Sequence, residues 1–231
     1  MPSSSSLNKL VVQNDAVILV NKPAGMTSFG VVARLRRLLS EDLGKKAKVG
    51  HAGTLDPFAS GLLIIMTGQK CREAQRLLKL DKSYRATLTL GWITSTQDPE
   101  GQMSLVGRNQ PSLRQIEAVL GNFLGEIQQV PPNFSALKVG GKKAYDLARA
   151  GKEFKLPARS VTVSQIDIID YDYPRLVIDV AVSSGAYIRS LARDIGEKLG
   201  TGAYCSALLR TSVGKFSLVK AKKLADFSII N

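Results

Sequence analysis

The sequence is poor in the residues that most metal sites and covalent hydrolase sites use. It has one histidine, His51, and two cysteines, Cys71 and Cys205, among 231 residues. A zinc site of the usual kind needs three or four His, Cys or carboxylate ligands at close spacing, and a Ser-His-Asp triad needs its histidine beside a serine nucleophile. Neither pattern occurs. Two cysteines without a CxxC spacing also give no disulfide framework, so we expect reduced thiols and no metal ion.

Sequence features of cofactor enzymes and of membrane proteins are missing as well. There is no GxxxxGKS or GxxxxGKT phosphate loop and no GxGxxG after a predicted strand, which argues against nucleotide hydrolysis and dinucleotide chemistry. No run of about 18 apolar residues occurs, and the opening stretch MPSSSSLNKL lacks the apolar core of a signal peptide. We therefore expect a cytoplasmic protein that works without a cofactor and without a membrane.

Acidic residues are few beside basic ones. The 19 Asp plus Glu residues stand against 32 Lys plus Arg, a formal net charge of +13. This balance favours a polyanionic partner, with RNA or DNA as the first candidate and an acidic membrane surface as the second. Hydrophobic residues make up 44% of the chain, which is enough for the core of one large domain or two small ones.

The spacing of apolar residues predicts strands mixed with helices. Strand patterns occur at 16–20, 61–68, 82–94 and 175–182. Helix patterns occur at 28–38, 72–80, 111–121 and 188–199. Ser28 is the predicted N-cap of the first helix, and Ser112 with Gln115 forms a predicted capping box in the third. The order has no regular beta-alpha-beta rhythm, so we expect an α+β fold with a largely antiparallel mixed sheet and flanking helices.

One segment departs from this pattern. Residues 131–157, PPNFSALKVGGKKAYDLARAGKEFKLP, are basic and contain paired prolines and paired glycines. Only one short helical pattern occurs there, at 144–149. We interpret the range of about 130–157 as an insertion that clasps a ligand.

The stretch GHAGTLDPFASGLL, residues 50–63, brings the single histidine and Asp56 together on a turn. Each candidate residue also has a purely structural interpretation. Asp56 before a proline can make an Asx-turn, and His51 can be a structural hydrogen bonder. Tyr84 can be a sheet-face aromatic, and Arg189 can be a solvated helix residue. None of them supports a function when it is taken alone.

Five elements in order resemble the TruB family of tRNA pseudouridine-55 synthases. GHAGTLDPFASGLL resembles the family's catalytic motif, NKPAGMTS its early DKPxGxTS element, and KSYRATLTLG its tyrosine motif. PPNFSALKVGGKKAYDLARAG resembles its RNA-gripping insertion, and SSGAYIRSLARDIGEKLG its arginine motif. The resemblance runs from about Val17 to Gly214. Asn21 replaces the aspartate that is usual in the DKP element.

The resemblance implies a pseudouridine-synthase fold and a reaction on uridine 55 in the T-loop of tRNA. Asp56 would be the reacting carboxylate, whether it attacks the sugar, attacks the base or abstracts a proton. Arg189 would bind that carboxylate, and a guanidinium suits this role because it stays charged. Tyr84 would stack on the target uracil, which must be flipped out of the loop. His51 would occupy the space that the flipped nucleotide leaves.

Further residues are expected to contact the RNA. Asp98 matches an acidic residue of the family near the target. Basic residues of the insertion should grip the T-arm: Lys138, Lys142 and Lys143. We expect a monomer that requires no protein partner.

The expected organisation is a flexible N-terminus at 1–9 and a catalytic domain at 10–231. Because the chain stops at Asn231, the small C-terminal PUA-like domain of longer relatives should be absent or vestigial. Two alternatives stay open. One is the related guide-RNA-dependent synthase of archaea and eukaryotes, which shares the HxGTLDP motif. The other is a non-catalytic module that binds or folds tRNA.

Overall fold

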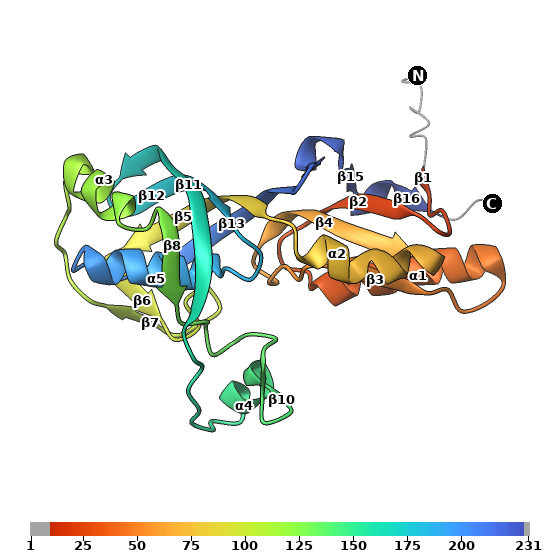
Figure 1. The fold of residues 1–231 in the computed structure, drawn as a ribbon, viewed down its shortest axis with the longest axis horizontal. Coiled ribbons are helices and arrows are strands. Elements are labelled where there is room, and N and C mark those ends of the chain that lie inside the picture. Colours follow the sequence, from red (N-terminus) through yellow and green to blue (C-terminus); the bar gives the residue numbers. More distant parts are fainter. Residues whose placement is uncertain (1–9, 229–231) are drawn as a thin grey trace, which may run out of the picture. The chain divides into compact units, whose positions relative to one another are not determined.

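The computed structural model describes residues 10–228, so the N-terminus expected to be flexible, residues 1–9, lies outside the described part. The chain divides into two compact units, residues 1–80 with 209–231, and residues 81–208. The strand β13 (Ala203–Val213) begins in the second unit and ends in the first. The range expected to form one catalytic domain therefore contains two units (Figure 1).

The first unit is a mixed sheet with a helix on each face. Its strands are β1 (Leu10–Val11), β2 (Val17–Lys22), β3 (Val49–Ala52), β4 (Ser60–Thr67), the end of β13, β14 (Phe216–Ser217), β15 (Lys222–Lys223) and β16 (Phe227–Ser228). The sheet order is β15-β2-β4-β13, with β3 on β4. Its α-helices are α1 (Ser28–Leu43) and α2 (Ala74–Leu78). Three short 3-10 turns complete it: Gly68–Glu73, Leu218–Lys220 and Leu224–Asp226.

Strand β4 separates the two cores of this unit, because alternate residues of a strand point to opposite faces. Leu63 and Ile65 pack with α1, whereas Leu62, Ile64 and Met66 pack with α2. This confirms the prediction that the run GLLIIMTG forms a buried strand. In the helix predicted at 28–38, the apolar residues Val31, Leu35 and Leu38 are buried as well.

Two predictions about helix ends in this unit were wrong. The N-cap of α1 is Thr27, whose side chain accepts a hydrogen bond from Gly30 N–H at 2.9 Å, while Ser28 is already helical and buried. The helix predicted over 72–80 is also shorter. It ends at Leu78, since Leu80 N–H bonds back by three residues to Leu77 O, which tightens the last turn.

The second unit holds the longer antiparallel strands. Its strands are β5 (Lys82–Leu90), β6 (Trp92–Thr94), β7 (Met103–Leu105), β8 (Gly125–Gln129), β9 (Lys138–Val139), β10 (Lys142–Lys143), β11 (Arg159–Asp172), β12 (Arg175–Val182) and the start of β13. The main sheet order is β13-β5-β12-β11-β8. Its helices are α3 (Leu113–Gly121), α4 (Ala144–Arg149) and α5 (Ile188–Lys198).

The alternation predicted for two central strands of this unit is confirmed. Tyr84, Ala86 and Leu88 of β5 are buried and lie opposite Val180, Ile178 and Leu176 of β12. The predicted capping box is present, because Ser112 caps α3 and Gln115 bonds back to it. Strands mixed with helices and mostly antiparallel pairing confirm the α+β class.

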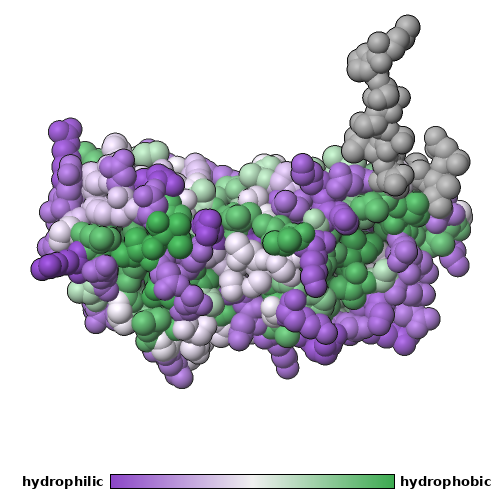
Figure 2. Space-filling view, turned by 90° about the horizontal axis from the view of Figure 1, so that it is seen from above, coloured by the Kyte–Doolittle hydropathy of each residue, from purple (hydrophilic) through white to green (hydrophobic). Residues whose placement is uncertain are grey.

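The surface mixes polar and apolar residues. On the face shown in Figure 2, hydrophobic residues reach the surface in patches between hydrophilic ones, as is usual for folded chains. Within residues 10–228, no helix is long and apolar enough to cross a membrane.

Gly61 is required where β4 meets β13. Its φ is +106°, and an added Cβ would lie 2.4 Å from Arg210 O and 2.7 Å from Arg210 N. Gly61→Ala should therefore lower the free energy of unfolding by at least about 2 kcal/mol, through backbone strain and overpacking. Chemical denaturation measures this loss.

Gly50→Ala is the matched control on the neighbouring β3. Its added Cβ would meet only Cys71 Sγ, at 3.9 Å, an ordinary contact. Equal stability of the two variants would contradict the close approach of β4 and β13.

Candidate active site

Asp56 lies on the loop between β3 and β4, and a buried lysine is hydrogen-bonded to that loop. Lys22 is fully buried. Its Nζ donates to three backbone carbonyls: Pro23 O at 2.8 Å, Met26 O at 2.6 Å and Pro57 O at 3.3 Å. Gly25 N–H also donates to Pro57 O, at 2.8 Å. The residue that follows Asp56 is therefore bound to the turn after β2.

The residue before Asp56 is fixed by the first turn of α1. Ser28 Oγ donates to Leu55 O at 2.9 Å and accepts from Leu55 N–H at 2.8 Å. Both backbone groups of Leu55 thus bond to one buried hydroxyl. This explains why Ser28 lies inside the helix and does not cap it.

A buried arginine of β13 holds the start of the same loop. Arg210 is 1% exposed. Its Nε donates to Leu62 O at 2.7 Å, its Nη2 to Gly53 O at 3.0 Å and its Nη1 to Thr54 O at 3.4 Å. A guanidinium presents its donors in a rigid planar fork, so these bonds fix the backbone that leads into Asp56.

The buried cations influence one another and Asp56. The pKa of Lys22 is lowered from 10.5 to about 8: burial lowers it most, the negative charge of Asp56 acts to raise it, and the charge of Arg210 lowers it. Attraction between charges is mutual, so the Lys22 ammonium also favours the ionised form of a nearby carboxylate.

His51 lies on β3 opposite Ile65 and is partly buried. Burial and the charge of Arg210 lower its pKa below the usual 6.5, so the ring is neutral at pH 7. Its Nδ1 is buried and has no hydrogen-bond partner among residues 10–228. A neutral ring suits the space-filling role expected for it, which stays a prediction.

In the second unit, Arg189 is buried in an ion pair, so its interpretation as a solvated helix residue is wrong. It lies in the first turn of α5, 3% exposed. Its Nη1 donates to Asp98 Oδ2 at 3.0 Å and to Thr96 O at 3.1 Å. Asp98 also accepts from Glu100 N–H at 3.0 Å. The pair therefore holds the loop between β6 and β7.

The start of the insertion is bound to the same helix. Arg189 Nη2 donates to Phe134 O at 2.7 Å, and Ser190 Oγ donates to Val130 O at 2.8 Å. Gln129 bonds to both backbone groups of Tyr187, which precedes α5. The helix that carries Arg189 thus sets where the insertion begins.

Tyr84, the other expected site residue of this unit, is 8% exposed on β5 and lies opposite Val180. Asp56 and His51 belong to the first unit, while Tyr84, Asp98 and Arg189 belong to the second. The structure brings Arg189 and Asp98 together. The expected binding of Asp56 by Arg189 stays a prediction.

The insertion contains the short helix expected at 144–149. Before it, β9 and β10 pair as a small hairpin that carries the three expected lysines, all exposed: Lys138, Lys142 and Lys143. Phe134 and Tyr145 meet edge to face at 6.0 Å, and the Arg149 guanidinium lies 5.4 Å from the Tyr145 ring. Aromatic contacts therefore hold the insertion together.

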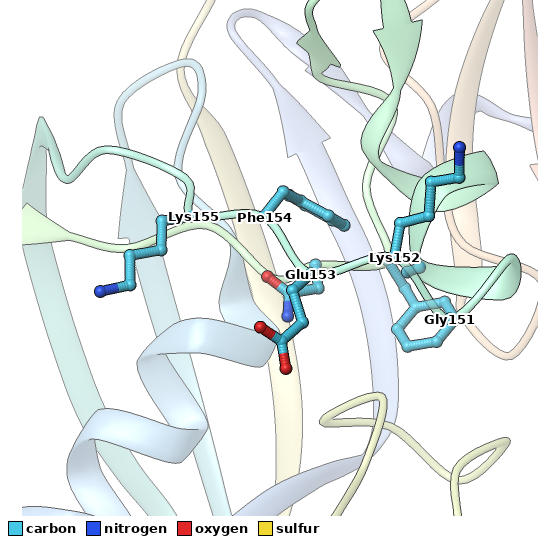
Figure 3. Close-up of a pocket in the computed structure, with 8 residues that line it drawn as sticks. Gly151, Lys152, Glu153, Phe154 and Lys155 are labelled. Atoms are coloured by element: carbon cyan, nitrogen blue, oxygen red, sulfur yellow. The ribbon is translucent and has the colours of Figure 1, made fainter.

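A pocket of about 590 Å³ opens within the insertion. Its lining includes Phe134 and the segment 151–155. In Figure 3, Lys152 and Lys155 extend away from each other along this segment. No group of three or more His, Cys, Asp or Glu that could hold a metal ion occurs in the described part of the chain.

Sequence reasoning missed the two buried cations of the first unit, Lys22 and Arg210. Lys22 stood inside a recognised motif, NKPAGMTS, and its position at the end of an apolar strand was the available signal. Arg210 follows Leu208 and Leu209 in a segment with no assigned role, so no sequence pattern indicated its contacts with the loop.

Comparisons with known proteins agree with these motifs. Residues 36–188 match the model of the TruB family pseudouridylate synthase (N terminal domain), and residues 189–230 match that of the tRNA pseudouridylate synthase B C-terminal domain. Two relatives carry the name tRNA pseudouridine synthase B. The one from Thiobacillus denitrificans is 44% identical over 94% of this chain and 71% of its own length. The one from Phocaeicola vulgatus is 42% identical over 91% of both.

The chain also resembles a solved structure titled as a Cbf5-Nop10-Gar1 complex. The TM-score is 0.70 with 31% sequence identity. The match covers 92% of this chain but only 53% of the solved one. This chain therefore spans about half the length of that structural relative.

The lowered pKa of Lys22 predicts a titration that NMR can follow. The Cε resonance of Lys22 should shift with a midpoint at about pH 8, and its absence in Lys22→Arg identifies the signal. A midpoint near 10.5, the ordinary value, would contradict the buried cation. Because the folded chain binds this proton less tightly than the unfolded chain, Lys22 makes the free energy of unfolding rise with pH between about 8 and 10.5.

Proposed function

The chain belongs to the TruB family of pseudouridylate synthases and isomerises uridine to pseudouridine in tRNA, and we propose that Asp56 supplies the carboxylate on which this reaction depends. One observation carries the proposal. The backbone before and after Asp56 is bound by three buried side chains, Lys22, Ser28 and Arg210. A reacting group must be held in place before the substrate arrives, and this loop meets that condition.

The reaction breaks the bond from ribose C1′ to uracil N1 and forms a bond from C1′ to C5. C5 loses its proton and N1 regains one, so the composition of the nucleotide does not change. A carboxylate can attack the sugar, attack the base or abstract a proton, and all three routes need its ionised form. The attraction between Lys22 and Asp56 favours that form.

Two residues of the second unit have proposed roles in the reaction. Tyr84 would stack on the flipped uracil, with its phenol near C5. Arg189 keeps its proposed role as a partner of the reacting carboxylate, and its ion pair with Asp98 supports a second role for both residues. By holding Phe134 and the loop of Asp98, Arg189 would position the insertion relative to the RNA.

His51 is proposed to fill the space that the flipped nucleotide leaves. A neutral imidazole suits this position, because a charged ring beside Arg210 would be repelled. Flipping itself costs a few kcal/mol in stacking and pairing. Contacts between the enzyme and the rest of the RNA must offset this cost.

The T-arm of tRNA is the proposed source of those contacts, with position 55 as the target. The exposed lysines of the β9–β10 hairpin support this, since exposed cations on an insertion can contact phosphates. The relatives named tRNA pseudouridine synthase B are 42–44% identical to this chain, against 31% for the Cbf5 complex. The higher identity to the proteins named for tRNA favours tRNA as the substrate. We propose that the protein acts as a monomer.

Asp56→Asn tests the mechanism. The variant keeps the size of the side chain but loses its charge, so turnover should fall by at least about a thousandfold while the affinity for tRNA changes less than about tenfold, roughly 1.4 kcal/mol. Release of tritium from C5 of labelled uridine in tRNA measures turnover, and filter binding measures affinity.

Asp42→Asn is the matched control, because Asp42 is an exposed carboxylate of α1. It should leave turnover and affinity unchanged. Tritium release by Asp56→Asn at a rate near wild type would remove Asp56 from the mechanism. Loss of both binding and turnover would favour a role for Asp56 in holding the fold.

An isolated T-arm hairpin tests the substrate assignment. If the T-arm supplies the contacts, the hairpin should react with kcat/KM within about tenfold of that for full tRNA, or roughly 1.4 kcal/mol. A hairpin with the target uridine replaced by cytidine should release no label and serves as the control. An inert hairpin beside reactive tRNA would contradict the T-arm proposal.

A further inference from the structure

We propose that the first unit carries a second RNA contact, a site for a backbone phosphate formed by Arg36, Lys46 and Lys48. The inference rests on the proposed function, because the ligand is the RNA that the enzyme modifies. These three cations line one pocket of about 380 Å³, together with Ala47 and Val49. We call it the Lys46 pocket.

The charges of the Lys46 pocket are not balanced within the described part of the chain. None of its three cations forms an ion pair with a residue in 10–228. Arg37, the next residue of α1, differs, since it pairs with Glu41 at 4.0 Å. Like charges around one concavity repel each other, so an anion in the pocket lowers their energy.

The guanidinium of Arg36 is held in a fixed position at the edge of β3. Its Nη2 donates to Val49 O at 3.0 Å, which leaves further N–H groups of the planar fork for a ligand. Arginine binds phosphate through parallel hydrogen bonds, and lysines add point charges. The chemistry of the pocket therefore fits a phosphodiester.

An exposed aromatic ring lies beside this site. Phe29 is 64% exposed, and the Arg36 guanidinium lies 5.8 Å from the centre of its ring. Seven residues make about two helical turns, so both side chains lie on the same side of α1. Aromatic rings next to cationic side chains are typical of surfaces that bind nucleic-acid strands by stacking.

The Lys46 pocket adjoins the start of β3, the strand that leads into the loop of Asp56. Val49 begins β3, and His51 follows two residues later, or about 7 Å along the strand. Figure 1 shows α1 alongside β3. An RNA strand whose target base reaches this loop therefore passes near the pocket. The phosphate can come from the T-arm or from another arm of the same tRNA.

The test compares two double variants that each remove two positive charges. Lys46→Ala with Lys48→Ala removes cations of the pocket. Arg34→Ala with Lys45→Ala is the control, since both residues are exposed and neither lines the pocket. Arg34 lies two residues before Arg36, about 200° around the helix axis. Matching thermal midpoints would show that all variants are folded.

Affinities for tRNA and for the T-arm hairpin are measured between 50 and 300 mM salt, which covers roughly the range where phosphate contacts dominate. The pocket variant should flatten the slope of log affinity against log salt by about 0.7 to 0.9, the contribution of one phosphate contact. The control should not change the slope. The rate at saturating RNA should be unchanged in the control.

Each outcome decides the proposal. A flatter slope with both RNAs assigns the phosphate to the T-arm, and a flatter slope with tRNA alone assigns it to another arm. Equal slopes for the pocket and control variants would overturn the site. Tritium release by the unmodified protein tests the proposed function separately, so the two failures can be told apart.

Discussion

The buried guanidinium of Arg210 holds the backbone on which the proposed catalytic carboxylate stands. Burial of a cation costs several kcal/mol unless hydrogen bonds replace those to water. Carbonyl oxygens of Gly53, Thr54 and Leu62 do so for Arg210. Lys22 is satisfied in the same way by the turn after β2 and by Pro57 O. Removing either cation would take a hydrogen-bond donor away from three backbone carbonyl groups.

These contacts also give the loop its electrostatic character. The fixed Lys22 ammonium interacts with Asp56, so the surroundings favour a negative charge before any substrate binds, and charge that is placed in advance needs no reorganisation during the reaction. The burial that provides this environment lowers the pKa of Lys22 to about 8. The protonated Lys22 in this buried position therefore lowers the free energy of unfolding at neutral pH.

The sequence predicted the parts of the fold that depend on local spacing. The alternation in β5 and β12 and the capping box of α3 were visible in the chain. Ser28 was misassigned as a cap, because its bonds to Leu55 are made 27 residues away. The contacts of Arg210 with Leu62 span 148 residues, and those of Arg189 with Asp98 span 91. The spacing of apolar residues along the chain does not show which distant residues form hydrogen bonds. A family motif shows which residues matter, but it does not show what they bond to.

Amide hydrogen exchange in the free protein tests most directly whether the loop of Asp56 is formed before RNA binds. The amides of Leu55 and Gly25 bond to Ser28 Oγ and Pro57 O, both at 2.8 Å. If the loop is held as described, both amides should exchange only through large-scale unfolding, with opening free energies close to that of the strand β4. Exchange of both amides at the rate of an exposed loop would mean that the loop opens freely, and would contradict a site that is organised in advance.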